Sequence, residues 1–188
     1  MKVLDQLRTA RSVLGQARRN RTDLIRALAR RPQLLAATGV FELGVATSAR
    51  VDARLKILAE LKAASIVACE YCLDIGSAMA RHEGLTERQL RELHHHRTSD
   101  AFDETERTVL DLAEALTRVP SVVDDDLRRR VEATLSRAQQ VELVTLIAWE
   151  NERARLNQGL GIAPSGFSDG QYCVLPEPAA TTGDRTSP

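Results

Sequence analysis

The chain has 188 residues, 26 basic and 26 acidic side chains, a formal net charge of zero, and an aromatic fraction of only 3%. This neutral, aromatic-poor composition argues against a nucleic-acid-binding protein, and no stretch approaches the roughly 20 apolar residues of a membrane span. The N-terminal stretch lacks the continuous apolar core of a secretion signal, so we expect a cytoplasmic protein. Abundant Ala, Leu and Arg favour helices, and the predicted fold class is all-α.

Helical signals begin near the N-terminus. Apolar side chains recur at helical spacing over residues 3–17, a second short helix is predicted over 22–30, and Pro32 suits the first turn of a third. A longer helix is predicted over about 51–66. The stretch "ACEYC", residues 68–72, either continues that helix or starts the next one.

Three later helices are predicted from capping boxes, in which a side chain and the residue three positions on satisfy each other's backbone N–H groups. Pro120 ends the second of these helices, and "DDDL" starts a short helix before the third. The three pairs are Thr86 with Gln89, Asp103 with Glu106, and Ser136 with Gln139.

The helical pattern stops after Gly161, where Gly, Pro, Ser and Thr become frequent. We expect an irregular strap that packs onto the helices through its few apolar side chains, and then a disordered tail. The predicted organisation is one helical domain over 1–162, a strap over 163–178 and a disordered tail over 179–188.

Cys69 and Cys72 stand three positions apart in a helical context, which places both sulfur atoms on one side of the helix. In a cytosolic protein such a pair is more often catalytic or metal-binding than a structural disulfide. Dithiol chemistry needs one thiolate as nucleophile and a second thiol to resolve the sulfenic acid or mixed disulfide. Inert packing of both cysteines in the core is the alternative that their spacing leaves open.

Zinc binding is a rival interpretation of the cysteine pair. A structural zinc site needs four nitrogen or sulfur ligands, and the further candidates are Cys173, His82 and the run His94, His95, His96. Consecutive histidines in a helix point about 100° apart and cannot all face one ion. We expect the run to end a surface helix, near the carbonyl end of its dipole, and we expect no metal and no other cofactor.

The stretches "CEYCLDIGSAMARHEGLTERQLREL", "FDETERTVLDLAEALTRVP" and "VELVTLIAWENERARLNQGLGI" together resemble the carboxymuconolactone decarboxylase and AhpD-like superfamily. The resemblance covers about residues 40–178 and is strongest to a branch that ends in "GFS-x-G-x-x-C-x-L-P", here 166–176. It implies an AhpD-like bundle of antiparallel helices. It also implies a homo-oligomer (a trimer, hexamer or dimer) with the cysteine helix near a subunit interface.

In the alkylhydroperoxidases of this superfamily the second cysteine attacks the peroxide, the first closes the disulfide, and a dithiol such as lipoamide regenerates the pair. The resemblance therefore implies a thiol-dependent oxidoreductase in which Cys72 attacks and Cys69 resolves. Its substrate would be a small organic hydroperoxide or a disulfide. A carboxymuconolactone decarboxylase-like lyase and a non-catalytic oligomeric relative are the alternatives.

The chain departs from this pattern at the groups that activate the thiol. Those peroxidases carry a histidine four residues after the second cysteine and a glutamate twelve residues before the first, and Gly76 and Ile57 occupy these positions here. Tyr71 stands where some members have a histidine between the cysteines. General-base assistance, worth about 10² to 10⁴ in rate, must therefore come from another group.

Glu150 is the favoured replacement, because it precedes Asn151 in the last helix, where the family signature turns inward. It would either pair with Arg153 on the helix surface or lie near the thiols with a raised pKa. Glu60 and His82 become candidates only if the fold brings them back to the cysteines.

The remaining candidates bind substrate or support the structure. Tyr71 and Glu70 lie between the cysteines, with Glu70 expected at the surface, and Asp74 is expected to be structural. Cys173 in the strap is a possible third thiol. The last helix adds three more candidates for substrate binding or structural support, which are Asn151, Arg155 and Asn157. In the lyase alternative, Arg153 and Arg155 would hold the substrate carboxylate.

Overall fold

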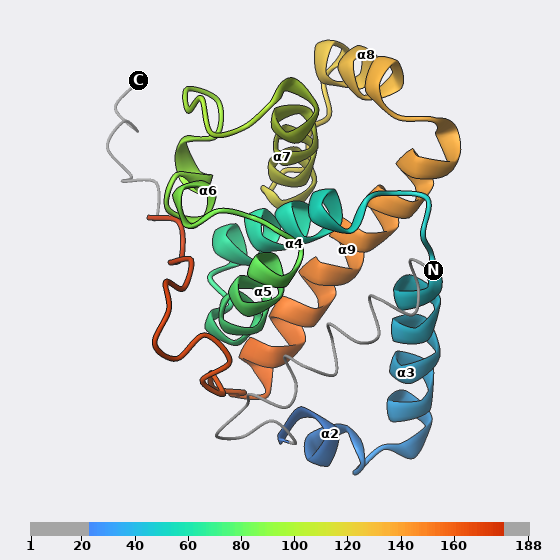
Figure 1. Ribbon diagram of the computed structural model, residues 1–188. Coiled ribbons are helices and arrows are strands. Elements are labelled where there is room, and N and C mark those ends of the chain that lie inside the picture. The colour runs from blue at the N-terminus through green and yellow to red at the C-terminus, as the bar shows by residue number, and fades with distance from the viewer. Residues whose placement is uncertain (1–22, 179–188) are drawn as a thin grey trace, which may run out of the picture.

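The computed structural model describes residues 23–178, which form helices joined by short connections, with no strand in this range (Figure 1). The predicted all-α fold class is confirmed. The helix expected over 3–17 and the tail expected over 179–188 lie outside the described residues. The elements are α2 (Asp23–Leu28), α3 (Pro32–Thr47), α4 (Ala53–Val67), α5 (Glu70–His82), α6 (Glu87–Arg91), the 3₁₀ helix η1 (Leu93–His95), α7 (Glu104–Thr117), α8 (Asp125–Thr134) and α9 (Arg137–Gly159).

The helix starts follow the local signals in the sequence. All three predicted capping boxes form, at Thr86 before α6, Asp103 before α7 and Ser136 before α9. Asp124 caps α8 by accepting from the backbone N–H of Leu127, and Pro32 is the first residue of α3. Each side-chain cap satisfies an N–H that has no partner within its helix, an effect of about 1 kcal/mol per cap.

The connection between α4 and α5 places the cysteines. Ala68 adopts a left-handed conformation with φ of 59° and ends α4, so the "ACEYC" stretch starts a new helix. Cys69 then occupies the N-cap of α5, where its sulfur accepts from the backbone N–H of Cys72 at 3.2 Å. Both sulfur atoms therefore lie at the positive end of the α5 dipole.

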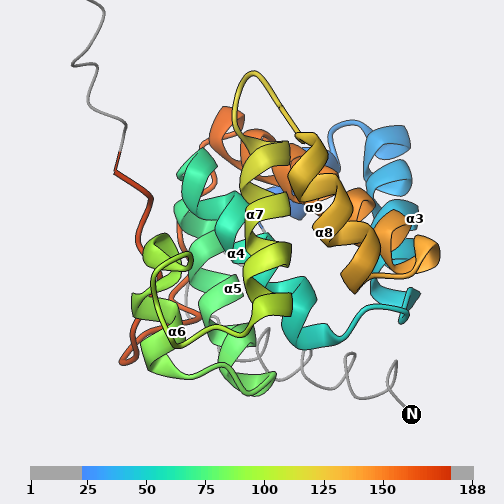
Figure 2. The ribbon, with the colours of Figure 1, turned by 90° about the horizontal axis from the view of Figure 1, so that it is seen from above.

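Helix α4 is the centre of the bundle and packs against α5, α7 and α9 (Figure 2). One apolar cluster includes Leu58, Leu61 and Phe102 and extends to both cysteines. A second cluster, which includes Val109 and Ile147, fills the space between α4, α7, α8 and α9. The cysteine helix is thus held on one side of α4, and the long α9 crosses the other elements beside it.

Helix α3 stands apart from this bundle, and none of its residues is fully buried. It contacts α9 through Phe41, whose ring stacks on Trp149 with centroids 4.1 Å apart. Its outer face exposes large apolar side chains, among them Val40 and Leu43. Because α3 touches α9 without filling the space beneath it, a cavity is left between α3 and the bundle. No helix within residues 23–178 has the length and apolar character that a membrane crossing requires.

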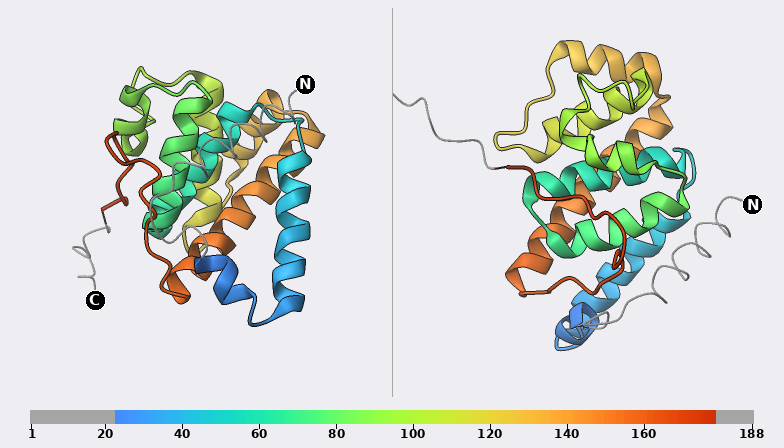
Figure 3. Two further views of the ribbon diagram at one scale, coloured as in Figure 1. Left: turned by 60° about the horizontal axis from the view of Figure 1, so that its bottom comes forward. Right: turned by 60° about the vertical axis from the view of Figure 1, so that its left-hand side comes forward.

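The segment after α9 is irregular and lies across α5 and α4, away from α3 (Figure 3). The carboxylate of Asp74 accepts from four successive backbone N–H groups, residues 165–168, at 2.7–3.1 Å, and from the hydroxyl of Ser168 at 2.7 Å. Burial alone would raise the pKa of Asp74, but these hydrogen bonds outweigh it and lower the pKa. Asp74 therefore has the structural role expected for it.

Farther along, the same segment is tied to α4 and α7. The backbone N–H of Glu177 donates to the carbonyl of Ser65, and its carboxylate pairs with the buried Lys62 at 3.2 Å and with Arg118. Together with the Asp74 contacts, these bonds hold the segment against α5, α4 and α7. The division at residue 162 into domain and strap stays a prediction.

Candidate functional site

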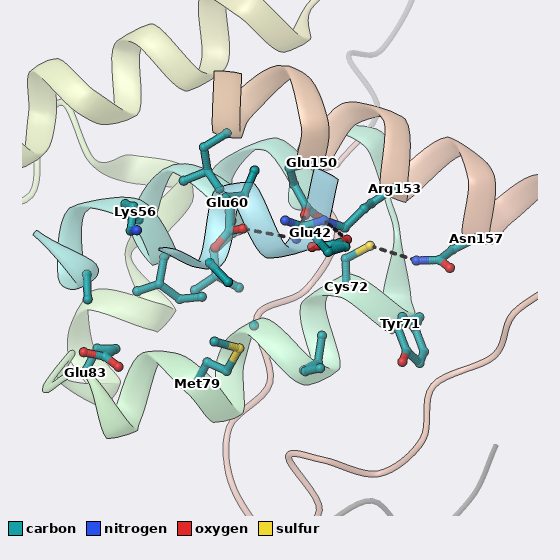
Figure 4. A pocket seen from close by; sticks show the side chains of 18 of the residues that line it. Glu42, Lys56, Glu60, Tyr71, Cys72, Met79, Glu83, Glu150, Arg153 and Asn157 are labelled. Carbon is teal, nitrogen blue, oxygen red and sulfur yellow. Dashed lines mark hydrogen bonds and ion pairs between the residues drawn. The ribbon is translucent and has the colours of Figure 1, made fainter. Parts of the chain in front are cut away.

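Cys69 and Cys72 are joined by a disulfide at the start of α5. Both are buried, with 1% and 7% of their surface exposed, but only Cys72 borders the cavity beneath α3. The amide Nδ2 of Asn157, from α9, lies 3.5 Å from the sulfur of Cys72 and 4.0 Å from that of Cys69 (Figure 4). The sulfur that a small molecule would meet first is therefore that of Cys72.

The cavity has a volume of about 360 Å³, in the range of small-molecule sites. It lies between α3, α4, α5 and α9, and its walls are mainly apolar. Such walls suit a hydrocarbon group better than a polar one. The apolar side chains that line it include Val45, Ile57, Leu61, Ile75, Met79 and Leu146.

The guanidinium of Arg153 forms ion pairs with three carboxylates in this cavity. Arg153 Nη1 donates to Glu150 at 2.7 Å and to Glu60 at 3.1 Å, and its Nε lies 3.0 Å from Glu42 (Figure 4). Glu150 and Arg153 come from α9, Glu60 from α4 and Glu42 from α3. All four side chains line the same cavity as Cys72. The fold thus brings together carboxylates that are far apart in the sequence.

This crowding changes the protonation of Glu150. Burial raises its pKa to about 8, and the nearby charges of Glu60 and Glu42 act in the same direction, while Arg153 opposes them. Glu150 does pair with Arg153, but the surface location considered from the sequence is wrong, because Glu150 is buried and lines the cavity that Cys72 borders. Burial therefore favours the protonated form of this carboxyl group.

The positions of the family histidine and glutamate lie where α5 and α4 meet. A Cβ atom on Gly76 would lie 2.9 Å from Cδ2 of Leu61, so α5 and α4 approach too closely for a larger residue unless Leu61 moves. Ile57, at the position of the family glutamate, is buried and lines the cavity. Glu60 lies three residues further along α4 and supplies a carboxylate to the same space.

The two residues between the cysteines point in different directions. Tyr71 lines the cavity and packs edge-on against Phe167, with ring centroids 6.0 Å apart. Its pKa is raised, first by burial and then by the charge of Asp74. Glu70 is exposed, as expected.

Of the three candidates in the last helix, only Asn157 reaches the cavity. Asn151 donates to the hydroxyl of Thr117 at 2.9 Å, which links α9 to α7. Arg155 is exposed and donates to the side-chain oxygen of Asn151 at 2.8 Å. Asn151 and Arg155 therefore support the helix packing and do not face the disulfide.

Cys173 and the histidines lie elsewhere. Cys173 is a free thiol whose sulfur lies 3.9 Å from the hydroxyl of Ser77, and it does not border the cavity. The ring of His94 bonds to the carbonyl of Leu175, and the buried His96 bonds to Asp111, each at 3.0 Å. Within residues 23–178, no three side chains of the types that bind metals cluster closely enough to hold an ion.

Sequence reasoning missed Glu42 and treated Glu60 as conditional. Glu42 is the single charged residue of α3, but its side chain is 43% exposed, so water could solvate the carboxylate without a partner. Its pairing with Arg153 follows from the fold and has no signal in the sequence.

Comparisons with known proteins agree with this architecture. The model of the carboxymuconolactone decarboxylase family matches residues 32–115. The uncharacterized protein YnjA of Escherichia coli (strain K12) is 32% identical over 127 residues, which span 68% of this chain and 67% of YnjA.

Two solved structures share the fold. The debrominase Bmp8 superposes with a TM-score of 0.74 at 20% identity, over 88% of this chain and 87% of Bmp8. ATU0492 from Agrobacterium tumefaciens is a protein of unknown function considered an antioxidant defence protein of the AhpD type. It superposes with a TM-score of 0.69 at 25% identity, over 79% of this chain and 97% of its own. The chain therefore belongs to the carboxymuconolactone decarboxylase family and has the helical fold of its AhpD-like members.

Proposed function

We propose that the protein is a thiol-dependent oxidoreductase whose Cys69–Cys72 pair reduces a small organic hydroperoxide or a disulfide and is regenerated by a dithiol. One observation carries the proposal: the sulfur of Cys72 borders an apolar cavity that also contains the carboxyl group of Glu150, with a pKa of about 8. That value is close to the ordinary thiol pKa of about 8.5. A carboxyl group whose pKa is raised by burial is a stronger base than an ordinary glutamate, which suits it to accept a thiol proton.

The first step uses Glu150 as base and then as acid. In the ionised form of Glu150, which becomes more populated as the pH approaches 8, the carboxylate takes the proton of the Cys72 thiol, and the amide of Asn157 stabilises the thiolate by donating to the sulfur. The thiolate attacks the terminal oxygen of the hydroperoxide, so that an S–O bond forms as the O–O bond breaks. The leaving alkoxide takes the proton from Glu150 and departs as an alcohol, which leaves Cys72 as a sulfenic acid.

The second step gives the disulfide that the structure contains. The thiol of Cys69 attacks the sulfenic sulfur of Cys72, the S–S bond forms, and the S–O bond breaks with release of water. The two thiols have then lost two electrons to the peroxide. Exchange with an external dithiol returns both cysteines to the reduced form.

The lyase alternative receives less support from the cavity. It needs a free cation to hold the substrate carboxylate, and Arg155 is exposed and faces Asn151. Among the described residues that border the cavity the cations are Lys56 and Arg153, and both are already paired with carboxylates.

Thiol counting tests the proposal directly. The reduced protein has three cysteines, and one equivalent of cumene hydroperoxide should leave one free thiol, that of Cys173. Addition of dihydrolipoamide should then restore all three. Three free thiols after treatment with excess peroxide would contradict the proposal.

A further inference from the structure

The ionisable side chains around the cavity are mostly acidic. Glu42, Glu60, Glu83 and Glu150 line it, against two cations. Glu83 comes from the end of α5, and no ion pair of this residue is found within the described range. The cavity thus combines apolar walls with an excess of carboxyl groups.

Neither cation is free to receive an anion. The guanidinium of Arg153 lies within 3.1 Å of three carboxylates. The ammonium group of Lys56 lies 3.2 Å from Glu142, which does not line the cavity, and donates to the carbonyl of Ser48 at 2.8 Å. A bound carboxylate would have to displace one of these partners.

The acidic excess persists when Glu150 is protonated. Glu42, Glu60 and Glu83 then remain against Arg153, because the charge of Lys56 is balanced by Glu142 outside the cavity. An anionic substrate would lose its hydration among apolar walls and would meet charges of its own sign. A neutral apolar molecule would meet neither penalty.

We propose that the cavity accepts uncharged or cationic apolar oxidants and rejects molecules that carry a carboxylate. The inference rests on the proposed function for its choice of oxidants, namely alkyl or aryl hydroperoxides and neutral disulfides. Hydroperoxides whose carboxylate would have to enter the cavity are excluded by their charge. The same selection applies to the reductant, so that dihydrolipoamide is preferred to the anionic dihydrolipoate.

A binding experiment on the oxidised protein tests this selection without any redox step. Calorimetric titration at pH 7 compares cumyl alcohol with 2-methyl-2-phenylpropanoate, which has a similar hydrocarbon group and a carboxylate. We expect cumyl alcohol to bind at least about tenfold more tightly, in line with the lower end of charge effects in clefts. Equal affinities, tighter binding of the carboxylate, or no binding of either compound would overturn the inference.

Two variants show whether the cavity carboxylates cause the selection. Glu42→Gln removes one negative charge from the cavity and should reduce the ratio of the two affinities, cumyl alcohol over the carboxylate, severalfold. Glu132→Gln, at an exposed position of α8, should leave this ratio unchanged. An unchanged preference in Glu42→Gln would contradict the electrostatic cause. Because neither titration involves the thiols, this inference and the proposed redox function can fail separately.

Discussion

Two buried carboxyl groups, Asp74 on α5 and Glu150 on α9, have pKa values that are shifted in opposite directions. Asp74 faces the C-terminal segment and accepts five hydrogen bonds, so its pKa is lowered although burial alone would raise it. Glu150 faces the cavity and shares one guanidinium with two other carboxylates, and burial raises its pKa to about 8. At Asp74 five hydrogen bonds together outweigh the effect of burial, whereas at Glu150 burial outweighs the single shared guanidinium.

Both regions contain a buried polar atom that has no partner among residues 23–178. Around Asp74 four backbone N–H groups and the hydroxyl of Ser168 donate to the carboxylate, while the hydroxyl of Ser165 has no partner in the described part of the chain. Beside the disulfide, the side-chain oxygen of Asn157 is buried and has no hydrogen-bond partner within the described residues. Polar groups left unsatisfied in a cavity are available to a ligand.

The largest expected effect is the loss of turnover in Cys72→Ser, because a serine hydroxyl cannot supply the thiolate. Without added reductant, Cys69→Ser should reduce one equivalent of hydroperoxide and then stop, since no neighbouring cysteine resolves the sulfenic acid. Consumption of cumene hydroperoxide measures both, with dihydrolipoamide as reductant for Cys72→Ser and without any reductant for Cys69→Ser. Cys173→Ser is the control and should retain turnover, and a Cys173→Ser variant as inactive as Cys72→Ser would place the chemistry elsewhere.

Glu150→Gln should slow the reaction of the thiol with hydroperoxide by about 10²-fold, the lower range of general-base assistance. The reactive form of the Glu150–Cys72 pair carries one proton, so the wild-type rate should rise as the pH approaches 8. In the variant, the rate should follow the titration of the thiol alone. Stopped-flow measurements of the reaction with hydroperoxide between pH 6 and 9 give both pH–rate profiles, with the exposed Glu152→Gln as control. Identical profiles in the wild type and in Glu150→Gln would contradict the role of Glu150.

Stability against pH provides a second measurement on the same variant. The folded-state pKa of Glu150, about 8, exceeds its unfolded value of about 4.5, so the folded protein binds the extra proton between these values. This contribution to stability is full below pH 4.5 and is lost as the pH rises to 8. Urea unfolding of the oxidised proteins should therefore show a flatter dependence on pH in Glu150→Gln than in the wild type over this window.

On the other face of α5, Asp74→Asn should lower the free energy of unfolding by about 2–3 kcal/mol, because an amide nitrogen would meet backbone N–H donors. The wild-type contribution should be present above the ordinary aspartate pKa near 3.9 and lost as the pH falls through the lowered folded value. Urea unfolding at pH 7 measures the loss, and the exposed Asp126→Asn is the control. A wild-type-like midpoint would contradict the anchoring role.

The smallest effect is expected for Ser168→Ala, which removes one of the five hydrogen bonds to Asp74 and leaves the backbone donors in place. A loss of about 1 kcal/mol is expected, with little change in peroxide reduction. A loss as large as that of Asp74→Asn would mean that the hydroxyl, rather than the backbone donors, carries the anchor.

Local signals in the sequence were enough to predict most helix starts. A capping box involves residues only three positions apart, so Thr86, Asp103 and Ser136 could be read without knowledge of the fold. The break at Ala68 could not be read in this way, because an alanine in the left-handed region has no local preference for it. There the packing of α5 against α4 decides the conformation.

The candidate site was only partly predictable for the same reason. The cysteine pair and Glu150 carry signals of their own, in spacing and in family resemblance. The ion pairs of Glu42 and Glu60 with Arg153 depend on how α3 and α4 lie against α9. Each pair joins residues that are more than 90 positions apart in the sequence. No local sequence pattern predicts such long-range ion pairs.

The contact between Gly76 and Leu61 sets a limit for protein engineering. In Gly76→His the new Cβ atom would lie 2.9 Å from Cδ2 of Leu61, so the end of the Leu61 side chain would have to shift. A companion change that shortens Leu61 would remove this contact. Because Gly76 also lines the cavity, a base introduced at this position needs a change on α4 as well as on α5.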